Sequence, residues 1–568
     1  MRTRAVALTA VVAVLLAAGI RAQQCDSCLI VPYWPVDASS SFPETATLGI
    51  PGPTSFGIAF SGGGTRSATA TTGSLRGLRQ NGWLDRVQYL TAVSGGSWAS
   101  VPFTYSRLPL EELLGEMEAP AAMTDVALAR TPQSHILQAV VASRLSVSGA
   151  AEALQIAATT NLAGRQVFGF DVNGVLDRVF GTRRSRDQTY ADVLGRIFLN
   201  DGLVPGGAQQ RYSWNDASVT ALVNANAPAP FESSDFITVA PKRPFLIVGG
   251  SIIYVHPAYD YPRLIPFELT PMYSGVRQRF GGRLGGGYVS PLGYDVEAAD
   301  FRGDGMLRVV TRTSGRVFTL ADVIAVSGAA PLLGVFRGKP FALARRGAEF
   351  FPAFNHVTVR ESNSRPAVRT LSHGDGGLTD NLGLMPLLAR GVRNVIVFDN
   401  AKDTFETNTD LQSLFEPLGK RDDWGGDRSG NLVFRSRAWS EVRDGLKRAT
   451  DAGHAAIYCG RGWTVDSNEL YGIRGYGGLN ICFVYNYAPQ SWRAQLPAET
   501  QTALTAQKRY RGFPWYATFG QNAPRVIRLD ERQVNLLANL TAWAVTDSWS
   551  VDTMCRALGA ALGCGPAQ

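Results

Sequence analysis

Two short apolar runs, each followed by a glycine-rich turn, form the clearest pattern in the chain. Residues 57–60 (GIAF) and 87–93 (VQYLTAV) have the apolar composition and length of buried strands. The turn 61–66 (SGGGTR) follows the first run, and the turn 93–98 (VSGGSW) follows the second. Each turn leads into a segment that we expect to be helical. The sequence therefore predicts two successive strand–turn–helix units.

A third unit of this kind is predicted far downstream. Residues 372–381 (SHGDGGLTDN) precede 382–388 (LGLMPLL), which have the pattern of a helix start, and 392–399 (VRNVIVFD) form another apolar run typical of a buried strand. The glycines around Asp375 allow another backbone to approach closely. Because Asp and Gly also favour ordinary turns, an aspartate with a purely structural role is the alternative.

The two early turns offer complementary groups for acyl transfer. Ser94 follows a strand on a turn whose neighbours are small, as in a nucleophile elbow. The glycines at 62–64 offer unhindered backbone N–H groups, which can face a developing oxyanion. Either turn alone is also common in packing, but the two together, in this order, indicate an acyl-transfer site.

These residues resemble the catalytic domain of the cytosolic phospholipase A2 and fungal lysophospholipase (phospholipase B) family, which is related to the patatins. Five landmarks in the family's order cover roughly residues 55–400. They are GGGTR at 62–66, VSGGSW at 93–98, YADVLGR at 190–196, FELTPMYSG at 267–275 and DGGLTDNL at 375–382. The resemblance implies an α/β fold: a central mixed β-sheet flanked by helices, with a nucleophile elbow and helical, lid-like insertions.

The mechanism that the resemblance implies is a Ser–Asp dyad. Ser94 would attack an ester carbonyl, and Asp375 would take its proton and later activate the water that clears the acyl-enzyme. A carboxylate needs a direct hydrogen bond to the serine and a desolvated site to act as this base. The resemblance further implies that the glycine loop, with Gly62, Gly63 and Gly64, forms the oxyanion hole together with Gly95.

Arg66 resembles the family arginine that steadies the lipid phosphate or the oxyanion, and its planar guanidinium suits phosphate. A surface charge on the first turn of a helix is the alternative. Two positions depart from the family pattern. Ala92 stands where the elbow usually has Gly, a small change, and Gly383 stands where the family tends to have Pro, which leaves the helix start after Asp375 uncertain.

A conventional Ser–His–Asp triad is the rival chemistry. The chain has five histidines, and Ser94, Asp375 and His454 occur in the order of the α/β-hydrolases. His373 lies two residues before Asp375 and could shape that turn. We favour the dyad, because the glycine loop precedes the elbow at the family's spacing and carries Arg66.

The N-terminus predicts export. A basic start, an apolar run at 5–18 and small residues near Ala22 form a secretory signal peptide at about 1–22. A membrane anchor or a mitochondrial presequence is the alternative. We therefore expect a secreted protein in which 23–568 form one large catalytic domain, with a helical insertion at about 105–240.

Cysteine usage agrees with export. Six cysteines permit three disulfides with 15 connectivities, and the sequence does not choose among them. Local pairing is the simplest expectation: Cys25–Cys28, Cys459–Cys482 and Cys555–Cys564. The triplet 539–541 (NLT) is a sequon for N-glycosylation.

Other segments carry weaker signals. In the insertion, Val172, Leu176, Val179 and Phe180 have helical spacing, which suits a lid or, equally, a core layer. The glycine run 281–287 predicts a loop, and 325–331 (AVSGAAP) predicts a helix end with a packing role. Residues 400–568 hold no landmark. The formal net charge of +8, without a basic stripe interleaved with aromatics, does not indicate nucleic-acid binding.

Together these features predict a secreted lipid acyl hydrolase that releases fatty acids from glycerophospholipids or lysophospholipids at a membrane or micelle surface, with peripheral contact only. We expect neither a cofactor nor a metal, and hence calcium-independent hydrolysis. One alternative is a neutral-lipid or small-ester hydrolase, or a transacylase, with the same dyad. A secreted lipid-binding protein with a vestigial site is the other.

Overall fold

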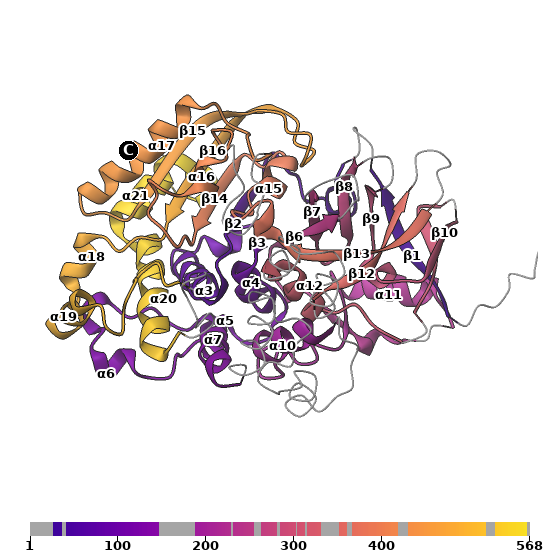
Figure 1. Ribbon diagram of the computed structural model, residues 1–568, viewed down its shortest axis with the longest axis horizontal. Coiled ribbons are helices and arrows are strands. Elements are labelled where there is room, and N and C mark those ends of the chain that lie inside the picture. The colour runs from indigo at the N-terminus through magenta and orange to yellow at the C-terminus, as the bar shows by residue number, and fades with distance from the viewer. Residues whose placement is uncertain are drawn as a thin grey trace, which may run out of the picture.

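The computed structural model describes residues 27–36, 41–146, 188–228, 231–254, 263–280, 284–302, 304–312, 315–330, 351–359, 366–418, 430–517 and 529–564. Within them, a mixed sheet of 14 strands forms the middle layer of the molecule (Figure 1). The prediction of an α/β fold with a central mixed sheet is confirmed at this level.

Parallel strands form the part of the sheet that carries the predicted landmarks. In spatial order they are β16 (Tyr476–Tyr485), β14 (Asn394–Asp399), β2 (Phe56–Phe60), β3 (Tyr89–Val93) and β6 (Phe245–Tyr254). The three apolar runs singled out in the sequence are thus β2, β3 and β14. Their carboxyl ends meet at one edge of the sheet, so the loops that follow them lie close together.

Antiparallel strands extend the sheet on both sides. Beyond β6 lie β7 (Arg263–Leu269), β8 (Ser274–Phe280), β9 (Leu284–Val289), β1 (Cys28–Pro35), β11 (Met306–Val310) and β10 (Ala298–Phe301), and β15 (Ile457–Val465) borders β16. In addition, β13 (Pro366–Asp375) pairs with β6 and with β12 (Ala353–Val359). This pairing carries Asp375 to the edge where β3 ends.

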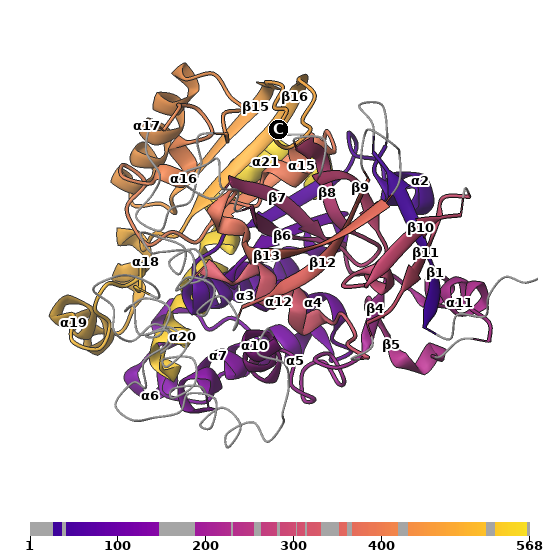
Figure 2. The same cartoon turned by 45° about the vertical axis from the view of Figure 1, so that its right-hand side comes forward.

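Two hydrophobic cores lie on opposite faces of the sheet. In β14, Ile396 and Phe398 belong to one core and Val395 and Val397 to the other, as alternating side chains require. The first core is covered by α3 (Gly64–Gln80), α4 (Gly95–Tyr105), α7 (His135–Ser146), α10 (Thr189–Phe198), α12 (Leu320–Ser327) and α20 (Glu531–Thr546). The second is covered by α15 (Met385–Ala389), α16 (Thr409–Gln412) and α17 (Arg437–Asp451) (Figures 1 and 2).

The remaining elements are mostly short, although the last helix adds Met554 and Leu558 to the first core. They are α2 (Pro43–Leu48), α5 (Leu110–Leu114), α6 (Asp125–Leu128), α11 (Asp216–Ala225), α18 (Gln490–Gln495), α19 (Ala498–Ala506), α21 (Ser548–Leu562) and the two-stranded sheet of β4 (Arg211–Ser213) and β5 (Phe236–Thr238). Across the described ranges, we find no helix that combines the length and apolar character needed to cross a bilayer.

The insertion contributes to the core where it is described. Ile136 and Leu137 of α7 and Val193 and Leu194 of α10 are buried in the core on the α3 face. For α7 and α10, this burial favours a core layer over a lid. The residues proposed for a lid, 172–180, lie outside the described residues, as does the predicted signal peptide.

The sequence predicted a loop for the glycine run at 281–287, and the structure corrects this prediction for the second half of the run. That half belongs to the buried strand β9. A Cβ on Gly287 would lie 2.3 Å from the Tyr33 hydroxyl oxygen, and one on Gly275 would lie 2.4 Å from the Gly287 carbonyl oxygen. These glycines therefore allow β1, β8 and β9 to pack closely. In the sequence, a glycine run needed for close packing looks the same as one that forms a loop.

Two of the three expected disulfides are confirmed. Cys459 is bonded to Cys482 across the β15–β16 pair, and Cys555 is bonded to Cys564 near the end of α21. Cys28 is also disulfide-bonded, and Cys25, its expected partner, lies outside the described residues.

The glycosylation signal at Asn539 is contradicted by the fold. The side chain is 3% exposed within α20, and its Oδ1 accepts hydrogen bonds from Arg76 Nη1 and from the Glu118 amide. A glycan has no room there in the folded protein.

Candidate active site

Ser94 occupies a sharp turn between β3 and α4. Its backbone has φ 51° and ψ −126°, a conformation that a non-glycine residue rarely adopts and that costs about 1–3 kcal/mol. A Cβ on Gly95 would lie 1.9 Å from the Gly64 carbonyl oxygen, and one on Gly96 would lie 2.9 Å from the Phe60 carbonyl oxygen. The small neighbours are therefore required, because the elbow packs directly on the first glycine turn.

Asp375 meets the Ser94 side chain. The Ser94 hydroxyl donates to Asp375 Oδ2 at 2.8 Å, although the two residues are 281 positions apart. The Gly377 amide donates to Asp375 Oδ1 at 2.7 Å, and the Ser251 hydroxyl donates to the Asp375 carbonyl at 2.8 Å. Ser94 is 5% and Asp375 3% exposed. The carboxylate is thus held in a desolvated position from which it can accept the serine proton.

The N-termini of two helices converge beside Ser94. Helix α3 begins at Gly64 and α4 begins at Gly95, and the two glycines are in backbone contact. The first N–H groups of a helix have no acceptor within the helix and lie at the positive end of its dipole. This arrangement suits the stabilisation of an oxyanion.

Gly62 plays a different part from the one expected of it. Its amide donates to the Asn381 carbonyl at 2.9 Å, so this N–H is already engaged. A Cβ on Gly62 would lie 2.3 Å from Asn381 Oδ1 and 3.0 Å from Ser94 Cβ. Gly62 therefore joins the first glycine loop to the Asp375 loop, and the expectation of oxyanion donors stays with Gly63, Gly64 and Gly95.

Arg66 lies beneath the first glycine loop. Its side chain donates from Nε to the Asn400 carbonyl at 3.1 Å and from Nη1 to the Tyr516 carbonyl at 2.6 Å. A Cβ on Gly63 would lie 2.5 Å from Nη2. Burial lowers the pKa of Arg66 to about 10, although the nearby carboxylate of Asp403 favours the charged form. The guanidinium thus ties the glycine loop to two distant segments.

The histidines have other partners. His373 is fully buried, with Nδ1 paired to the Leu371 carbonyl at 2.9 Å and Nε2 paired to the Tyr294 hydroxyl. Burial lowers the pKa of His373 to about 3, so the ring is neutral at physiological pH. His454 stacks on Trp549 with ring centroids 4.5 Å apart. Because Ser94 donates directly to Asp375, neither ring mediates that contact.

Two residues of the site were not identified from the sequence. Ser327 accepts a hydrogen bond from the Ser94 amide at 2.8 Å, although its segment predicted only helix packing. The Asn381 carbonyl accepts from the Gly62 amide in the first glycine loop, and the Asn381 side chain donates to Asp410. Neither contact leaves a local pattern in the sequence, because the partners are far apart in the chain.

The two further landmarks lie near the site without forming it. The Tyr190 hydroxyl donates to the Gly328 carbonyl at 2.6 Å, and the Asp375 charge adds to burial in raising the pKa of Tyr190. Glu268 forms an ion pair with Arg390, which follows α15. Helix α15 begins at Met385, with Gly383 at φ 69° in the loop before it.

Comparisons with known proteins give a short sequence match and a distant structural similarity. No family model matches the chain. Over 38 residues, 7% of this chain and 4% of the relative, the chain is 60% identical to cytosolic phospholipase A2 zeta of Mus musculus. Among solved structures, human GIVD cytosolic phospholipase A2 aligns over 90% of this chain and 60% of its own chain, at 13% identity and a TM-score of 0.43.

The same human enzyme in complex with methyl gamma-linolenyl fluorophosphonate aligns over the same shares, at 14% identity and a TM-score of 0.42. This chain therefore spans less than two thirds of the length of the proteins to which it is similar. Similarity to the fungal lysophospholipases and the patatins stays a prediction from the sequence motifs.

Proposed function

We propose that this chain is a serine lipid acyl hydrolase that cleaves fatty acyl esters of phospholipids or lysophospholipids. The single observation that carries the proposal is the direct hydrogen bond from the Ser94 hydroxyl to Asp375 Oδ2 at 2.8 Å. It joins a strained, elbow-like serine to a buried carboxylate, which is the geometry that a Ser–Asp dyad needs.

In the proposed reaction, Asp375 takes the Ser94 proton as Oγ attacks the ester carbonyl carbon. The carbonyl oxygen becomes an oxyanion, which the amides of Gly63, Gly64 and Gly95 stabilise. The tetrahedral intermediate collapses as the C–O bond to the alcohol breaks, and the proton held by Asp375 passes to the departing oxygen. Water, deprotonated by Asp375, then attacks the acyl-enzyme, releasing fatty acid and returning the proton to Ser94.

The lipid substrate is supported by the motif resemblance and by the short match to a cytosolic phospholipase A2. Arg66 is proposed to steady the phosphate or the oxyanion, either directly through Nη2 or through the glycine loop that it underlies. We further propose that the protein is exported, contacts membranes peripherally, and hydrolyses its substrate without calcium.

The test is fatty-acid release from lysophosphatidylcholine and diacyl phosphatidylcholine, with a chelator present. The wild type, Ser94→Ala and Asp375→Asn are compared, and Ser100→Ala serves as a matched control. Ser100 is a buried serine on the same helix, and its hydroxyl has no hydrogen-bond partner among the residues that the structure describes. We expect both site variants to lose activity by about 10⁴-fold or more, and the control to retain it.

Other outcomes would redirect the assignment. Activity that survives Asp375→Asn but not Ser94→Ala would place the base elsewhere, with His454 as the next residue to replace. A folded wild type that releases nothing from either lipid would leave another ester class or a binding role.

Arg66→Ala separates head-group binding from loop support. If Arg66 contacts the lipid phosphate, the substitution lowers turnover of the phospholipid more than turnover of a neutral ester. Equal loss on both substrates would mean that Arg66 acts on the oxyanion, directly or through the loop, and not on the lipid phosphate.

A further inference from the structure

Ser327 makes a contact with Ser94 that the dyad itself does not explain. It is the last residue of α12 and is fully buried, 233 positions away from Ser94 in the sequence. The Ser94 amide donates to Ser327 Oγ at 2.8 Å, and the Ser327 hydroxyl donates to the Gly249 carbonyl at 2.7 Å. A serine hydroxyl has one proton, so donation to Gly249 directs a lone pair at Ser94.

The Ser327 hydroxyl links β6 to the elbow that follows the neighbouring strand β3. Gly249 of β6 pairs with Val93 of β3, the residue just before Ser94. Ser327 therefore connects the middle of β6 to the elbow, at the point where the β3–β6 ladder stops. The positive φ of Ser94 turns its amide, and the β3–β6 ladder no longer supplies an acceptor for it. The Ser327 hydroxyl is the acceptor instead.

The end of α12 is itself held firmly. The Tyr190 hydroxyl donates to the Gly328 carbonyl, the residue after Ser327, at 2.6 Å. A Cβ on Gly328 would lie 2.8 Å from the Trp98 ring nitrogen, so this glycine packs against α4. The Ser327 hydroxyl thus has a rigid base, which a group that fixes a strained neighbour requires.

We propose that Ser327 is a positioning residue that holds Ser94 in its attacking conformation. The inference rests on the proposed function, in which Ser94 is the nucleophile. Ser327 binds the Ser94 amide and thereby orients Oγ toward Asp375 and toward the N-termini of α3 and α4. It also keeps this amide out of the oxyanion hole, which leaves the hole to the glycine amides.

The experiment compares the wild type with Ser327→Ala, Ser327→Thr and the control Ser100→Ala. The primary readout is the rate at which an alkyl fluorophosphonate labels Ser94, because this reaction reports nucleophile geometry without lipid binding. Values of kcat and KM on lysophosphatidylcholine and the thermal midpoint Tm are measured on the same preparations.

We expect Ser327→Ala to slow labelling and lower kcat by roughly tenfold or more, the loss of about one hydrogen bond, with KM changing much less. The Ser327→Thr variant retains the hydroxyl and recovers most of the labelling rate. Ser100→Ala labels at the wild-type rate.

Three results would overturn the proposal. The first is labelling of folded Ser327→Ala within about twofold of the wild type, a difference too small for one hydrogen bond. The second is slow labelling of Ser327→Ala that is explained entirely by the fraction of this variant that is unfolded at the assay temperature. The third is a folded threonine variant as slow as alanine. Failure of the proposed function is distinguishable, because the wild type would then either show no labelling of Ser94 or release no fatty acid from lysophosphatidylcholine.

Discussion

Ser94 is held in an unfavourable backbone conformation by several weak restraints rather than one strong one. The Ser97 amide donates to the Ser94 carbonyl at 2.9 Å, and Ser327 accepts from the Ser94 amide. Gly95 and Gly96 provide the close approach to the first glycine turn. Each restraint is of the order of one hydrogen bond or one packing contact, and together they offset a strain of about 1–3 kcal/mol.

Two buried histidines lie on the strand that ends at Asp375 and on its partner strand. His373 precedes Asp375 by two residues on β13, and His356 lies on the paired strand β12 with its ring centroid 6.5 Å from that of His373. Both His356 ring nitrogens are buried, and within the described part of the chain neither has a hydrogen-bond partner. Burial lowers the pKa of His356 to about 4, and burial together with the charge on His356 lowers that of His373 to about 3.

We predict that His356 makes the protein sensitive to acid. Its pKa is depressed in the folded state, so its stabilising contribution is present above pH 6.5 and is lost as the pH falls through about 4. Between pH 7 and 4.5, urea unfolding of the wild type should lose about 2 kcal/mol more than that of His356→Leu. Parallel losses in the two proteins would contradict the prediction.

The two glycine turns and the Asp375 loop act as a unit. The turns before α3 and α4 touch through Gly64 and Gly95, and the loop after β13 joins them through Asn381 and Asp375. Helix α20, from the part of the chain without sequence landmarks, packs on α3 so closely that a Cβ on Gly73 would lie 2.1 Å from the Ala538 carbonyl oxygen. The C-terminal region therefore supports the helix that begins at the glycine loop.

Gly95→Ala tests this junction. The added methyl would overlap the Gly64 carbonyl and push the two helix N-termini apart, so we expect labelling of Ser94 to fall by about 100-fold or more. Gly477→Ala is the matched control, because a Cβ there meets no atom within 4 Å and its φ is ordinary. A folded Gly95→Ala variant with wild-type labelling would show that the junction tolerates displacement.

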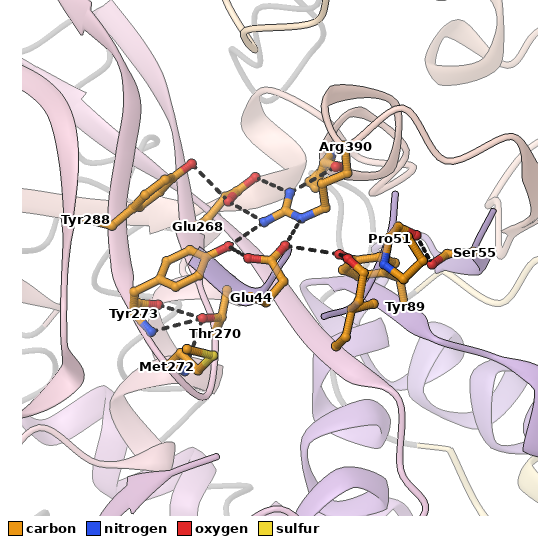
Figure 3. A network of polar contacts seen from close by, with 12 residues as sticks. Glu44, Pro51, Ser55, Tyr89, Glu268, Thr270, Met272, Tyr273, Tyr288 and Arg390 are labelled. Atoms are coloured by element: carbon orange, nitrogen blue, oxygen red, sulfur yellow. Dashed lines mark hydrogen bonds and ion pairs between the residues drawn. The ribbon is translucent and has the colours of Figure 1, made fainter. Parts of the chain in front are cut away.

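A buried charge network connects three segments that lie far apart in the chain (Figure 3). Arg390 donates from Nε to Glu44 of α2 at 2.6 Å and forms a bidentate pair with Glu268 of β7 at 3.0 Å. Its Nη2 also donates to the Tyr273 hydroxyl at 2.6 Å. Burial disfavours the charge on Arg390, but these partners outweigh it and raise the pKa of Arg390.

Arg390→Met should lower the free energy of unfolding by about 3–5 kcal/mol, because it leaves the buried carboxylate of Glu44 and the partly buried one of Glu268 without their cation. Arg443→Met, which removes an exposed pair with Asp444, should change the free energy by less than about 1 kcal/mol. Urea titration measures both. A loss of less than about 1 kcal/mol for Arg390→Met would mean that the network adds little to stability.

The elements that carry the site were predictable because their signals are local. A buried parallel strand needs an apolar run, a tight turn needs glycine, and a cysteine paired with a near neighbour needs only a short spacing. For this reason β2, β3 and β14 and the turns before α3 and α4 were identified from the residues alone. The pairs Cys459–Cys482 and Cys555–Cys564 were the simplest expectation among 15 connectivities, and the structure contains both.

The surroundings of the site residues depend on contacts between residues that are far apart in the chain. The acceptor of the Ser94 amide, the clasp between Gly62 and Asn381, and the burial of Arg66 under the glycine loop join residues hundreds of positions apart. Such contacts depend on which loops the sheet order brings to one edge, and no spacing or periodicity in the chain records that order. The local residue pattern indicated the proposed nucleophile, and the family resemblance of the motifs implied its partner, because both signals lie in short segments; packing across the sheet determined the surroundings of the two residues.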